Sequence, residues 1–402
     1  MRLLGSRCMA EPISRSASID WRARARKLAP VAREEALASE RGGTLTERVV
    51  RAIGEAGLFG LAAPACLGGA EQGLETQLEV WEVVSCADGS AGWCLMACAT
   101  SSAFAGAFCG PEAAREMFRG GGWVSHAGQF APRGQGRVTP GGYRVQGDYS
   151  FGSGCAHSQW IAAGFVPLRD GAARLLESGL PEMHVAYLPR EEVLFRGNWH
   201  VAGLQGTGSF DYSVLDKEVP EAFTFPLFVD APRQGGDLYR LGIFPITAAG
   251  HAGFALGVGR RALDEIERLA HQKTRMGAAE PVARSPRFQH ELARAEAKLR
   301  AARAFVYDAF GDIERGVLAG DAPRLEQRAL VRTATTYATE VAAEVADFSY
   351  NFAGTDSLRL PSDLQRSWRD IHAATQHVFV DAKTYLDSAQ VFLGIAPPHL
   401  PL

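Results

Sequence analysis

The spacing of apolar residues changes twice along this chain, and this change limits the possible folds more than any other feature. Residues 19–120 carry apolar side chains at helical spacing. Residues 123–220 are rich in glycine, aromatic and β-branched residues, which is typical of strands and tight turns. From about Leu241 the helical spacing returns. The sequence therefore predicts helices, then strands, then helices, in an α+β protein that is mainly α.

The first part should contain at least three helices. Thr44-Leu45-Thr46-Glu47 fits a capping box, and Gly57 is a natural end for the helix that follows it. Leu74–Cys86 is again periodic. Gly89–Phe108 is small and apolar on all sides, so it should form a buried helix.

The middle part should form a small barrel or sandwich of strands. Residues Tyr143–Tyr149 alternate between the two faces of a strand, directly after the turn signal Gly141-Gly142. Trp160–Val166 and His184–Leu188 are further short apolar runs. Strands of this length need a second layer to cover their apolar face.

The last part should be a four-helix bundle, because long helices with short connections pack against one another. Apolar residues at helical spacing mark these helices at Val258–Leu269, Phe288–Ala302, Leu330–Phe348 and Ile371–Leu393. The predicted domain limits are residues 19–120, 121–232 and 233–402.

The composition excludes several classes of partner. The formal net charge of the 402 residues is only -3, whereas nucleic-acid binders carry a basic excess. Residues 1–18 lack the apolar stretch of a secretory signal and read as a frayed end, so we expect a cytoplasmic protein without a membrane partner. The seven cysteines show no CxxC spacing, and no metal site is expected.

Four segments, in this order and on these predicted elements, resemble the acyl-CoA dehydrogenase superfamily. Within it they are most similar to the oxygenase components of two-component flavin-dependent monooxygenases. The resemblance runs from about residue 20 to 395. The segments are Leu61–Gly69 with its Pro-x-x-x-Gly-Gly loop, Gly141–Gly154 followed by His157 and Trp160, Trp199–Ser209 followed by Asp211, and Trp368-Arg369-Asp370 with His377.

The resemblance implies a cofactor, partners and a reaction. Reduced FMN, or FAD, would come from a separate NAD(P)H:flavin reductase, in agreement with the lack of a nicotinamide-binding fingerprint in this sequence. The flavin would react with O2 to a C4a-hydroperoxide that hydroxylates an aromatic or polyketide-type substrate. The same resemblance implies a homotetramer.

His377 and Ser153 are the catalytic residues that the resemblance implies. Dehydrogenases of the superfamily carry a glutamate base beside the place of His377, but residues 371–380 contain no Glu or Asp. An imidazole can manage protons near neutral pH. The Ser153 hydroxyl would contact flavin N5, since a hydroxyl both donates and accepts. A buried structural histidine and a plain turn serine remain the alternatives.

Further contacts follow from the same resemblance. Arg275, at the end of the first bundle helix, would bind the flavin phosphate of a neighbouring subunit, although a cation complementing the helix dipole is an equal explanation. Trp160 would flank the flavin ring. The full set of predicted cofactor contacts is Gln129, Ser153, Gly154, Trp160, Arg275, Gly354, Thr355 and Asp356.

The substrate-binding part of the site is predicted from the buried helix Gly89–Phe108. Relatives often carry a histidine there, whereas Met96–Ala103 contains Thr100, Ser101 and Ser102. This pattern suggests a roomy pocket lined by hydroxyls, which suits a large neutral polycycle, and His157 is a further candidate substrate contact. Tight helix packing would explain the same small residues.

Three rival functions remain open on the sequence. The chain could be an acyl-CoA dehydrogenase with its base on another helix, an N- or S-oxygenase of the same fold, or a silent member that binds no flavin. The lack of a Glu near His377 argues against the first. The presence of Ser153, Arg275 and His377 argues against the last.

Overall fold

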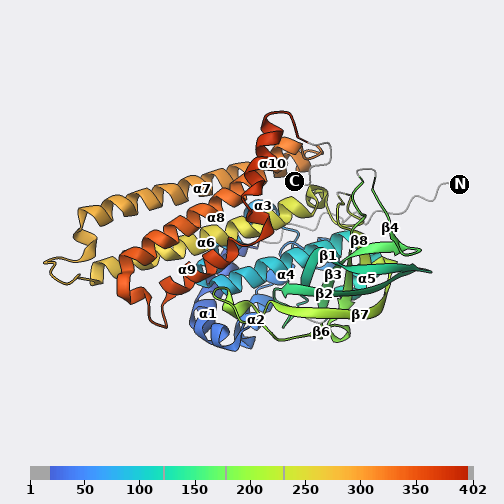
Figure 1. Ribbon diagram of the computed structural model, residues 1–402, viewed down its shortest axis with the longest axis horizontal. Helices are drawn as coiled ribbons and strands as arrows, with labels where there is room; N and C mark the ends of the chain where they lie inside the picture. The colour runs from blue at the N-terminus through green and yellow to red at the C-terminus, as the bar shows by residue number, and fades with distance from the viewer. Residues whose placement is uncertain (1–18, 121–122, 177–178, 230, 397–402) are drawn as a thin grey trace.

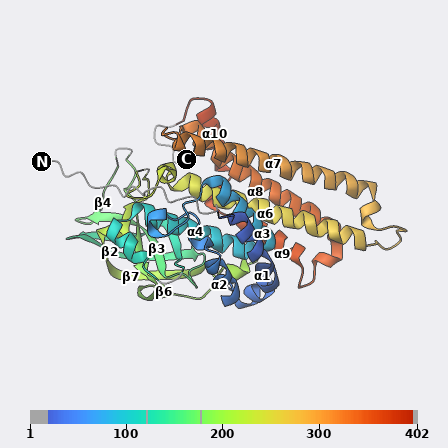
Figure 2. The ribbon, with the colours of Figure 1, turned by 180° about the vertical axis from the view of Figure 1, so that it is seen from behind.

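The computed structural model describes residues 19–120, 123–176, 179–229 and 231–396. The predicted frayed end, residues 1–18, lies outside this range. Figure 1 shows the predicted order as three parts: helices in blue and cyan, a green sheet at one end, and long yellow to red helices. Figure 2 shows from behind that the cyan helix α4 lies between the sheet and the long helices.

The first part is helical, as predicted. Two predicted segments, Leu74–Cys86 and Gly89–Phe108, are confirmed as α3 and α4 to within one residue. The helices are α1 (Trp21–Gly42), α2 (Glu47–Glu55), α3 (Leu74–Ala87), α4 (Gly89–Phe108) and α5 (Pro111–Met117).

The predicted capping box at Thr44 is wrong by two residues. The N-cap of α2 is Thr46, whose backbone is extended and whose Oγ1 accepts from the Val49 N–H at 3.4 Å. The Thr44 hydroxyl is buried without a hydrogen-bond partner among the described residues. Gly57 ends this segment in the left-handed region, as expected.

Helix α4 is the centre of the molecule. Its N-cap is Asp88, whose carboxylate accepts from the Ala91 N–H at 2.9 Å. Among the described helices it alone is long and apolar enough to cross a membrane, but 94% of that apolar window is buried inside the protein. Its apolar character is therefore explained by contacts with the sheet on one side and the bundle on the other.

The strands form one mixed sheet rather than two separate layers. The hydrogen-bonded order is β6-β7-β2-β1-β3-β5-β8, with β4 beside β3. Among the described strands only β1 and β3 pair in parallel, and the other pairs are antiparallel. Gly141 makes the predicted turn between β1 and β2. The strands are β1 (His126–Thr139), β2 (Gly142–Gly152), β3 (Trp160–Arg169), β4 (Ala172–Ala173), β5 (His184–Pro189), β6 (Leu194–Phe195), β7 (Phe210–Pro220) and β8 (Thr224–Pro226).

Three of the four predicted bundle helices are confirmed, and each is longer than predicted. They pack closely because several glycines face a neighbouring helix: a Cβ on Gly257, for example, would lie 2.4 Å from the Glu82 carbonyl oxygen of α3. These helices are α6 (Ile243–Gln272), α7 (Pro286–Leu318) and α8 (Leu325–Ala353).

The predicted fourth helix, Ile371–Leu393, is wrong as one continuous element. The chain forms α9 (Asp363–Ala374), a single 3-10 turn η9 (Val378–Val380) and α10 (Lys383–Phe392). His377 is extended, with φ -79° and ψ 136°, and its Nδ1 accepts from the Phe379 N–H at 3.2 Å. This side-chain bond stabilises the break, and it places His377 between helices instead of on one.

Candidate active site

Ser153 lies in a turn after β2, against a second turn that precedes β7. Gly154 has φ +75°, and its N–H donates to the Thr207 carbonyl at 3.2 Å. A Cβ on Gly154 would lie 2.4 Å from the Cys98 Sγ of α4. Glycine is therefore required at position 154. The preceding Ser153 is half-buried where the sheet meets α4.

The Ser153 hydroxyl belongs to a chain of hydrogen bonds. The Trp93 Nε1–H of α4 donates to Ser153 Oγ at 3.0 Å. Ser153 Oγ lies 2.8 Å from Ser209 Oγ, which lies 2.7 Å from Thr207 Oγ1. Thr207, in the 3-10 turn η4 (Gln205–Thr207), donates to the Leu204 carbonyl at 2.9 Å. Three hydroxyls and one indole are thus linked in series.

His377 lies on the other side of Trp93. The His377 ring is 5.8 Å from the Trp93 ring, edge to face. It is 4.2 Å from the ring of His251, a buried residue of α6 that also contacts Trp93. Phe379 of η9 stacks on His251 at 5.5 Å. The break between α9 and α10 therefore brings two imidazoles together beside the indole that holds Ser153.

Both imidazoles are neutral at physiological pH. Burial, and then the nearby Arg332 guanidinium, lowers the pKa of His377 to about 4. Burial, His377 and Arg332 hold the pKa of His251 well below its usual value. Because His377 Nδ1 accepts a backbone N–H, its single proton is on Nε2. His377 therefore presents a hydrogen-bond donor at Nε2.

Arg332 of α8 is a charged group without a countercharge in contact. Its guanidinium lies 4.8 Å over the Phe379 ring, and Nη2 donates to Thr384 Oγ1 at 3.2 Å. Within the described part of the chain Arg332 forms no ion pair, and the Asp387 carboxylate acts on it only from a distance. Its field disfavours a second positive charge, which is one reason why the adjacent histidines stay unprotonated.

His157 follows Ser153 on the same turn. Both of its ring nitrogens are buried without a hydrogen-bond partner among the described residues. Burial, with a smaller contribution from Arg190, lowers its pKa to about 4. Burying two ring nitrogens without hydrogen bonds costs free energy. His157 could therefore hydrogen-bond to a ligand through either nitrogen.

Trp160 and Gln129 lie on neighbouring strands of the sheet. Trp160, at the start of β3, stacks on Phe223 at 5.5 Å. The Gln129 backbone N–H donates to the Tyr212 hydroxyl at 2.8 Å, while its side-chain Oε1 is buried and has no partner among the described residues. Gln129 therefore keeps an unused acceptor.

The hydroxyls of α4 are largely used inside the protein. Ser101 Oγ lies 3.1 Å from the Tyr187 hydroxyl, and Ser102 Oγ lies 2.9 Å from His126 Nδ1. Only the Thr100 hydroxyl is buried without a partner. The sequence suggested Ser101 and Ser102 as pocket lining, but both hydroxyls bond to side chains of the sheet instead of facing an open cavity.

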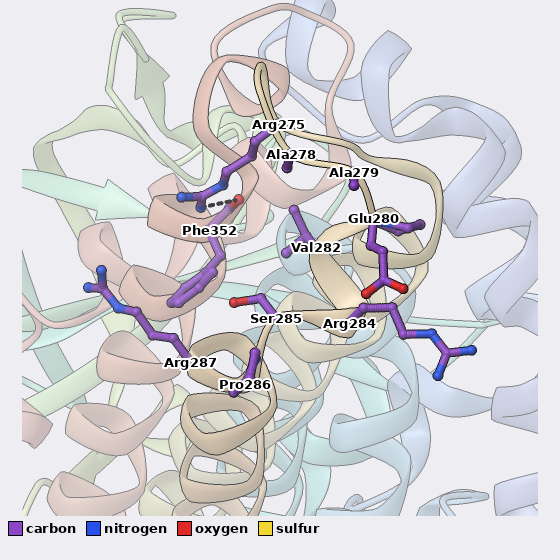
Figure 3. A pocket seen from close by; sticks show the side chains of 11 residues that line it. Arg275, Ala278, Ala279, Glu280, Val282, Arg284, Ser285, Pro286, Arg287 and Phe352 are labelled. Atoms are coloured by element: carbon purple, nitrogen blue, oxygen red, sulfur yellow. Dashed lines mark hydrogen bonds between the residues drawn. The ribbon is translucent and has the colours of Figure 1, made fainter.

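Arg275 lies at the opposite end of the bundle. Its Nη2 donates to the Phe352 carbonyl at 3.5 Å, and Lys273 Nζ donates to the Ala353 carbonyl at 2.7 Å and pairs with Asp356 at 2.5 Å. This joins the end of α6 to the predicted Gly354-Thr355-Asp356 segment. Arg275 and Arg287 lie on either side of the Phe352 ring, beside a hollow of about 470 Å³ (Figure 3).

The predicted site residues therefore form two groups. Ser153, Gly154, His157 and His377 gather around α4, while Arg275 and the 354–356 segment gather at the far end. From His251 to the end of α6 at Gln272 the axial distance is about 30 Å, at 1.5 Å per residue. Most of the length of α6 therefore separates Arg275 from the imidazole pair beside Trp93.

Comparisons with known proteins agree with this fold. Residues 21–118 match the N-terminal domain of acyl-CoA dehydrogenases, and residues 249–382 match their C-terminal domain. Indole-3-acetate monooxygenase of Pseudomonas putida is 30% identical over 88% of each chain. This chain belongs to the acyl-CoA dehydrogenase family.

Other relatives specify the branch. A flavin-dependent monooxygenase, oxygenase subunit HsaA of Rhodococcus jostii, is 27% identical over 93% of this chain and 97% of its own length. The crystal structure of 3-HSA hydroxylase from Rhodococcus sp. RHA1 superposes with a TM-score of 0.86 at 25% identity, covering 95% of this chain and 99% of that one. This member of the acyl-CoA dehydrogenase family is a flavin-dependent monooxygenase, and the dehydrogenase alternative is not supported.

Sequence reasoning gave no site role to four buried residues: Trp93, His251, Thr207 and Ser209. Trp93 and Ser209 bond to Ser153, and His251 packs against His377. Thr207 bonds to Ser209, and both lie in the quoted segment Trp199–Ser209. One signal was available: His251 is the only strongly polar residue between Ile246 and Gly259, in an otherwise small and apolar helical stretch. Such a residue in a buried stretch needs a partner or a function.

Proposed function

We propose that this monooxygenase hydroxylates an aromatic substrate at the site formed by Ser153, Trp93 and the His251–His377 pair. The observation that carries the proposal is that, among the described residues, two neutral imidazoles and no carboxylate contact the indole that binds Ser153. A dehydrogenase needs a carboxylate base to remove a carbon-bound proton. A hydroxylase needs neutral groups that orient a polar substrate and move protons near pH 7.

The described residues fit a flavin at Ser153. The hydroxyl has an unused lone pair, Gln129 Oε1 is an unused buried acceptor, and Gly154 lets the turn approach closely. Reduced FMN or FAD, when bound there, would supply the electrons with which one atom of O2 enters the substrate and the other leaves as water. A separate NAD(P)H:flavin reductase would deliver it.

His377 would act by donation. Its Nε2–H can hydrogen-bond to a substrate oxygen. The adjacent His251, whose nitrogens have no hydrogen bond to described residues, can accept a substrate O–H or N–H. The aromatic faces of Trp93, Phe254 and Phe379 border the same place and would exclude water from it. This arrangement orients a ring that carries a polar substituent.

The two separate groups of residues support an oligomer. Because Arg275 lies about 30 Å along α6 from His251, it would serve the flavin of a second copy, with Arg287 and Phe352 beside it. Guanidinium groups bind phosphate with two donors, which suits this role. We propose a homotetramer in the cytoplasm, with Gly354, Thr355 and Asp356 at the same shared site.

The substrate class follows from one relative and one side chain. The relative from Pseudomonas putida acts on indole-3-acetate, a bicyclic aromatic acid. Arg332 gives this chain an unpaired cation near the imidazoles. We therefore favour an indole or similar small aromatic ring over the large neutral polycycle that the α4 hydroxyls suggested.

The test is oxygen labelling with a defined flavin supply. The protein is given reduced FMN, or reduced FAD, by a flavin reductase in an ¹⁸O₂ atmosphere, with indole or indole-3-acetate as substrate. We expect one ¹⁸O atom in the product by mass spectrometry, and its loss in Ser153→Ala. Stopped-flow mixing of the reduced complex with oxygen should show a transient absorbance before oxidised flavin appears. Bleaching of bound flavin by an acyl-CoA, without label, would overturn the proposal.

A further inference from the structure

The Arg332 side chain has a hydrogen-bond donor that the fold leaves unused. Its Nε is buried and has no hydrogen-bond partner among the described residues. Its Nη2 donates to Thr384 Oγ1 at 3.2 Å, and its guanidinium lies over the Phe379 ring. The Asp387 carboxylate, which acts on Arg332 from a distance, is paired with Lys383 at 2.5 Å. A buried cationic N–H without an acceptor costs free energy, because it gives up water and gains no partner.

A second unused polar group lies on the same face of α8. Thr336 follows Arg332 by four residues, so the two side chains are neighbours on the helix. Thr336 is fully buried, and its Oγ1 has no partner among the described residues. The adjacent Thr335 differs, since its Oγ1 donates to the Val331 carbonyl at 2.8 Å. This face of α8 therefore keeps one N–H and one O–H without an acceptor.

These two donors lie beside the proposed substrate site. The Phe379 ring that carries the Arg332 guanidinium also packs on His251 at 5.5 Å and on His377 at 5.8 Å. The guanidinium is close enough to lower the pKa of both imidazoles. One aromatic ring thus connects the cation with the two imidazoles that would orient the substrate.

An anion is the ligand that this arrangement lacks. A neutral substrate would leave the Arg332 charge buried and unpaired, whereas an anionic group would neutralise it. A carboxylate suits the place, because its two oxygens match the planar N–H groups of a guanidinium and can also accept from a hydroxyl. The adjacent aromatic side chains suit the ring to which such a carboxylate is attached.

We propose that Arg332 binds a carboxylate of the substrate, so that this site takes aromatic acids with a short side chain in preference to neutral aromatic rings. Thr336 would donate to the same carboxylate. The inference rests on the proposed function, since it assumes that the substrate ring lies beside His251 and His377. Arg332 is then a specificity-determining residue, which holds the acid group and takes no part in oxygen transfer.

Arg332→Met is the first test, because methionine can still pack on Phe379 but carries no charge. The two ligands are indole-3-acetate and 3-methylindole, which has the same ring and first side-chain carbon without the carboxylate. Calorimetric titration under argon, with the protein saturated with reduced FMN, measures both dissociation constants without turnover. The acid should bind the unmodified protein more tightly. In Arg332→Met the ratio of dissociation constants, 3-methylindole over indole-3-acetate, should fall about 100-fold, the effect of removing one partner of a buried ion pair.

Arg332→Lys is the second variant, in case Arg332→Met does not fold. Lysine keeps the charge but lacks the Nε–H and the planar fork, so the same ratio should fall about tenfold, the effect of one hydrogen bond to a charged group. Arg324→Met is the matched control. Arg324 stands at the start of the same helix, is exposed and lies 3.8 Å from Asp312, so its loss should leave the ratio unchanged.

The outcomes separate this inference from the proposed function. If neither ligand binds the unmodified protein, the proposed function fails and the inference fails with it. If both ligands bind the unmodified protein equally well, or if the ratio in each folded Arg332 variant equals that of the unmodified protein, Arg332 does not bind a carboxylate. Hydroxylation of an aromatic ring then still stands, and the inference alone is overturned.

Discussion

The tautomer of His377 is the residue-scale feature with the most direct consequence for chemistry. Its Nδ1 is occupied by the Phe379 N–H, so the neutral ring can only donate from Nε2. With a pKa lowered to about 4 by burial and Arg332, His377 stays neutral in the folded enzyme across the physiological range. A donor role is therefore favoured over the general base that a histidine at this place first suggests.

Amide substitutions of His377 test this role. The amide nitrogen of His377→Gln can reach the place of Nε2, whereas the amide oxygen of His377→Asn replaces only Nδ1. We expect the amount of product formed per reduced flavin to fall about 100-fold in the His377→Asn variant, which is the usual effect of losing a catalytic proton donor. The fall should be far smaller in the His377→Gln variant. Flavin affinity should change little in either. Equal loss in both variants would show that donation from Nε2 is not what His377 contributes.

Ser153 and His251 show which site residues could be predicted from the sequence and which could not. Ser153 was predicted because it stands in a motif beside Gly154 and after an aromatic strand, and its neighbours in sequence are also its neighbours in space. His251 lies 126 positions before His377 and packs against it at 4.2 Å. No spacing rule connects two helices across such a distance, so this contact appears only in the folded chain.

At the scale of elements, the close approach of α3 and α6 depends on glycine. A Cβ on Gly257 would lie 2.4 Å from the Glu82 carbonyl oxygen and 2.8 Å from Ser85 Cβ, both on α3. We expect Gly257→Ala to lower stability by about 1–3 kcal/mol, because the helices must separate. Thermal unfolding should show a lower Tm.

Gly316 of α7 is the matched control. A Cβ there meets only Gln327 Nε2 at 3.6 Å, an ordinary contact. Gly316→Ala should raise stability by about 0.5–1 kcal/mol through helix propensity. A lower Tm in both variants would mean that the close approach of α3 and α6 is not the cause of the loss at Gly257.

Asp370 ties α9 to the turn that carries the hydroxyl chain. Its Oδ1 accepts from the Leu204 N–H at 2.6 Å, and burial, with the nearby Asp88, raises its pKa to about 7. Since the folded pKa lies above the unfolded value of about 3.9, the folded state binds the extra proton, and stability falls as pH rises through 7.

Asp370→Asn tests this linkage, because the amide resembles the protonated acid. Near pH 4 its Tm should match that of the unmodified protein. Between pH 4 and pH 7 the variant should become progressively the more stable of the two, since over this range the unfolded carboxyl is ionised while the buried one still binds its proton, and the difference should level off above pH 7. Scanning calorimetry across this range measures the difference, and a constant difference would contradict a raised pKa.

The break between α9 and α10 marks the limit of prediction for elements. Ile371–Leu393 keeps apolar residues at helical spacing, and that pattern predicts one helix. The structure interrupts it because the His377 ring caps the Val378–Val380 turn and packs on His251 and Trp93. A tertiary contact outweighs the local pattern here, and it does so at His377, for which we propose a catalytic role.

At the scale of the whole molecule, the order helix–sheet–helix could be predicted because each part keeps a different apolar period over many residues. The site could not, because it forms where three parts meet: Trp93 from the first, Ser153 from the sheet, and His251 and His377 from the bundle. The proposed phosphate contact, Arg275, lies at the far end of the bundle, and in the proposed homotetramer it would serve a second copy.

Mixing two inactive variants tests that requirement. Ser153→Ala lacks the proposed N5 contact and Arg275→Ala lacks the proposed phosphate contact, so each alone should lose most activity with reduced flavin limiting. If a site combines Ser153 of one copy with Arg275 of another, co-expression should restore roughly a quarter of the sites, since half of random pairs are mixed and half of the sites in each mixed pair are intact. If each site is completed within one chain, co-expression restores nothing, and Arg275 would then be a helix-end cation rather than a cofactor contact.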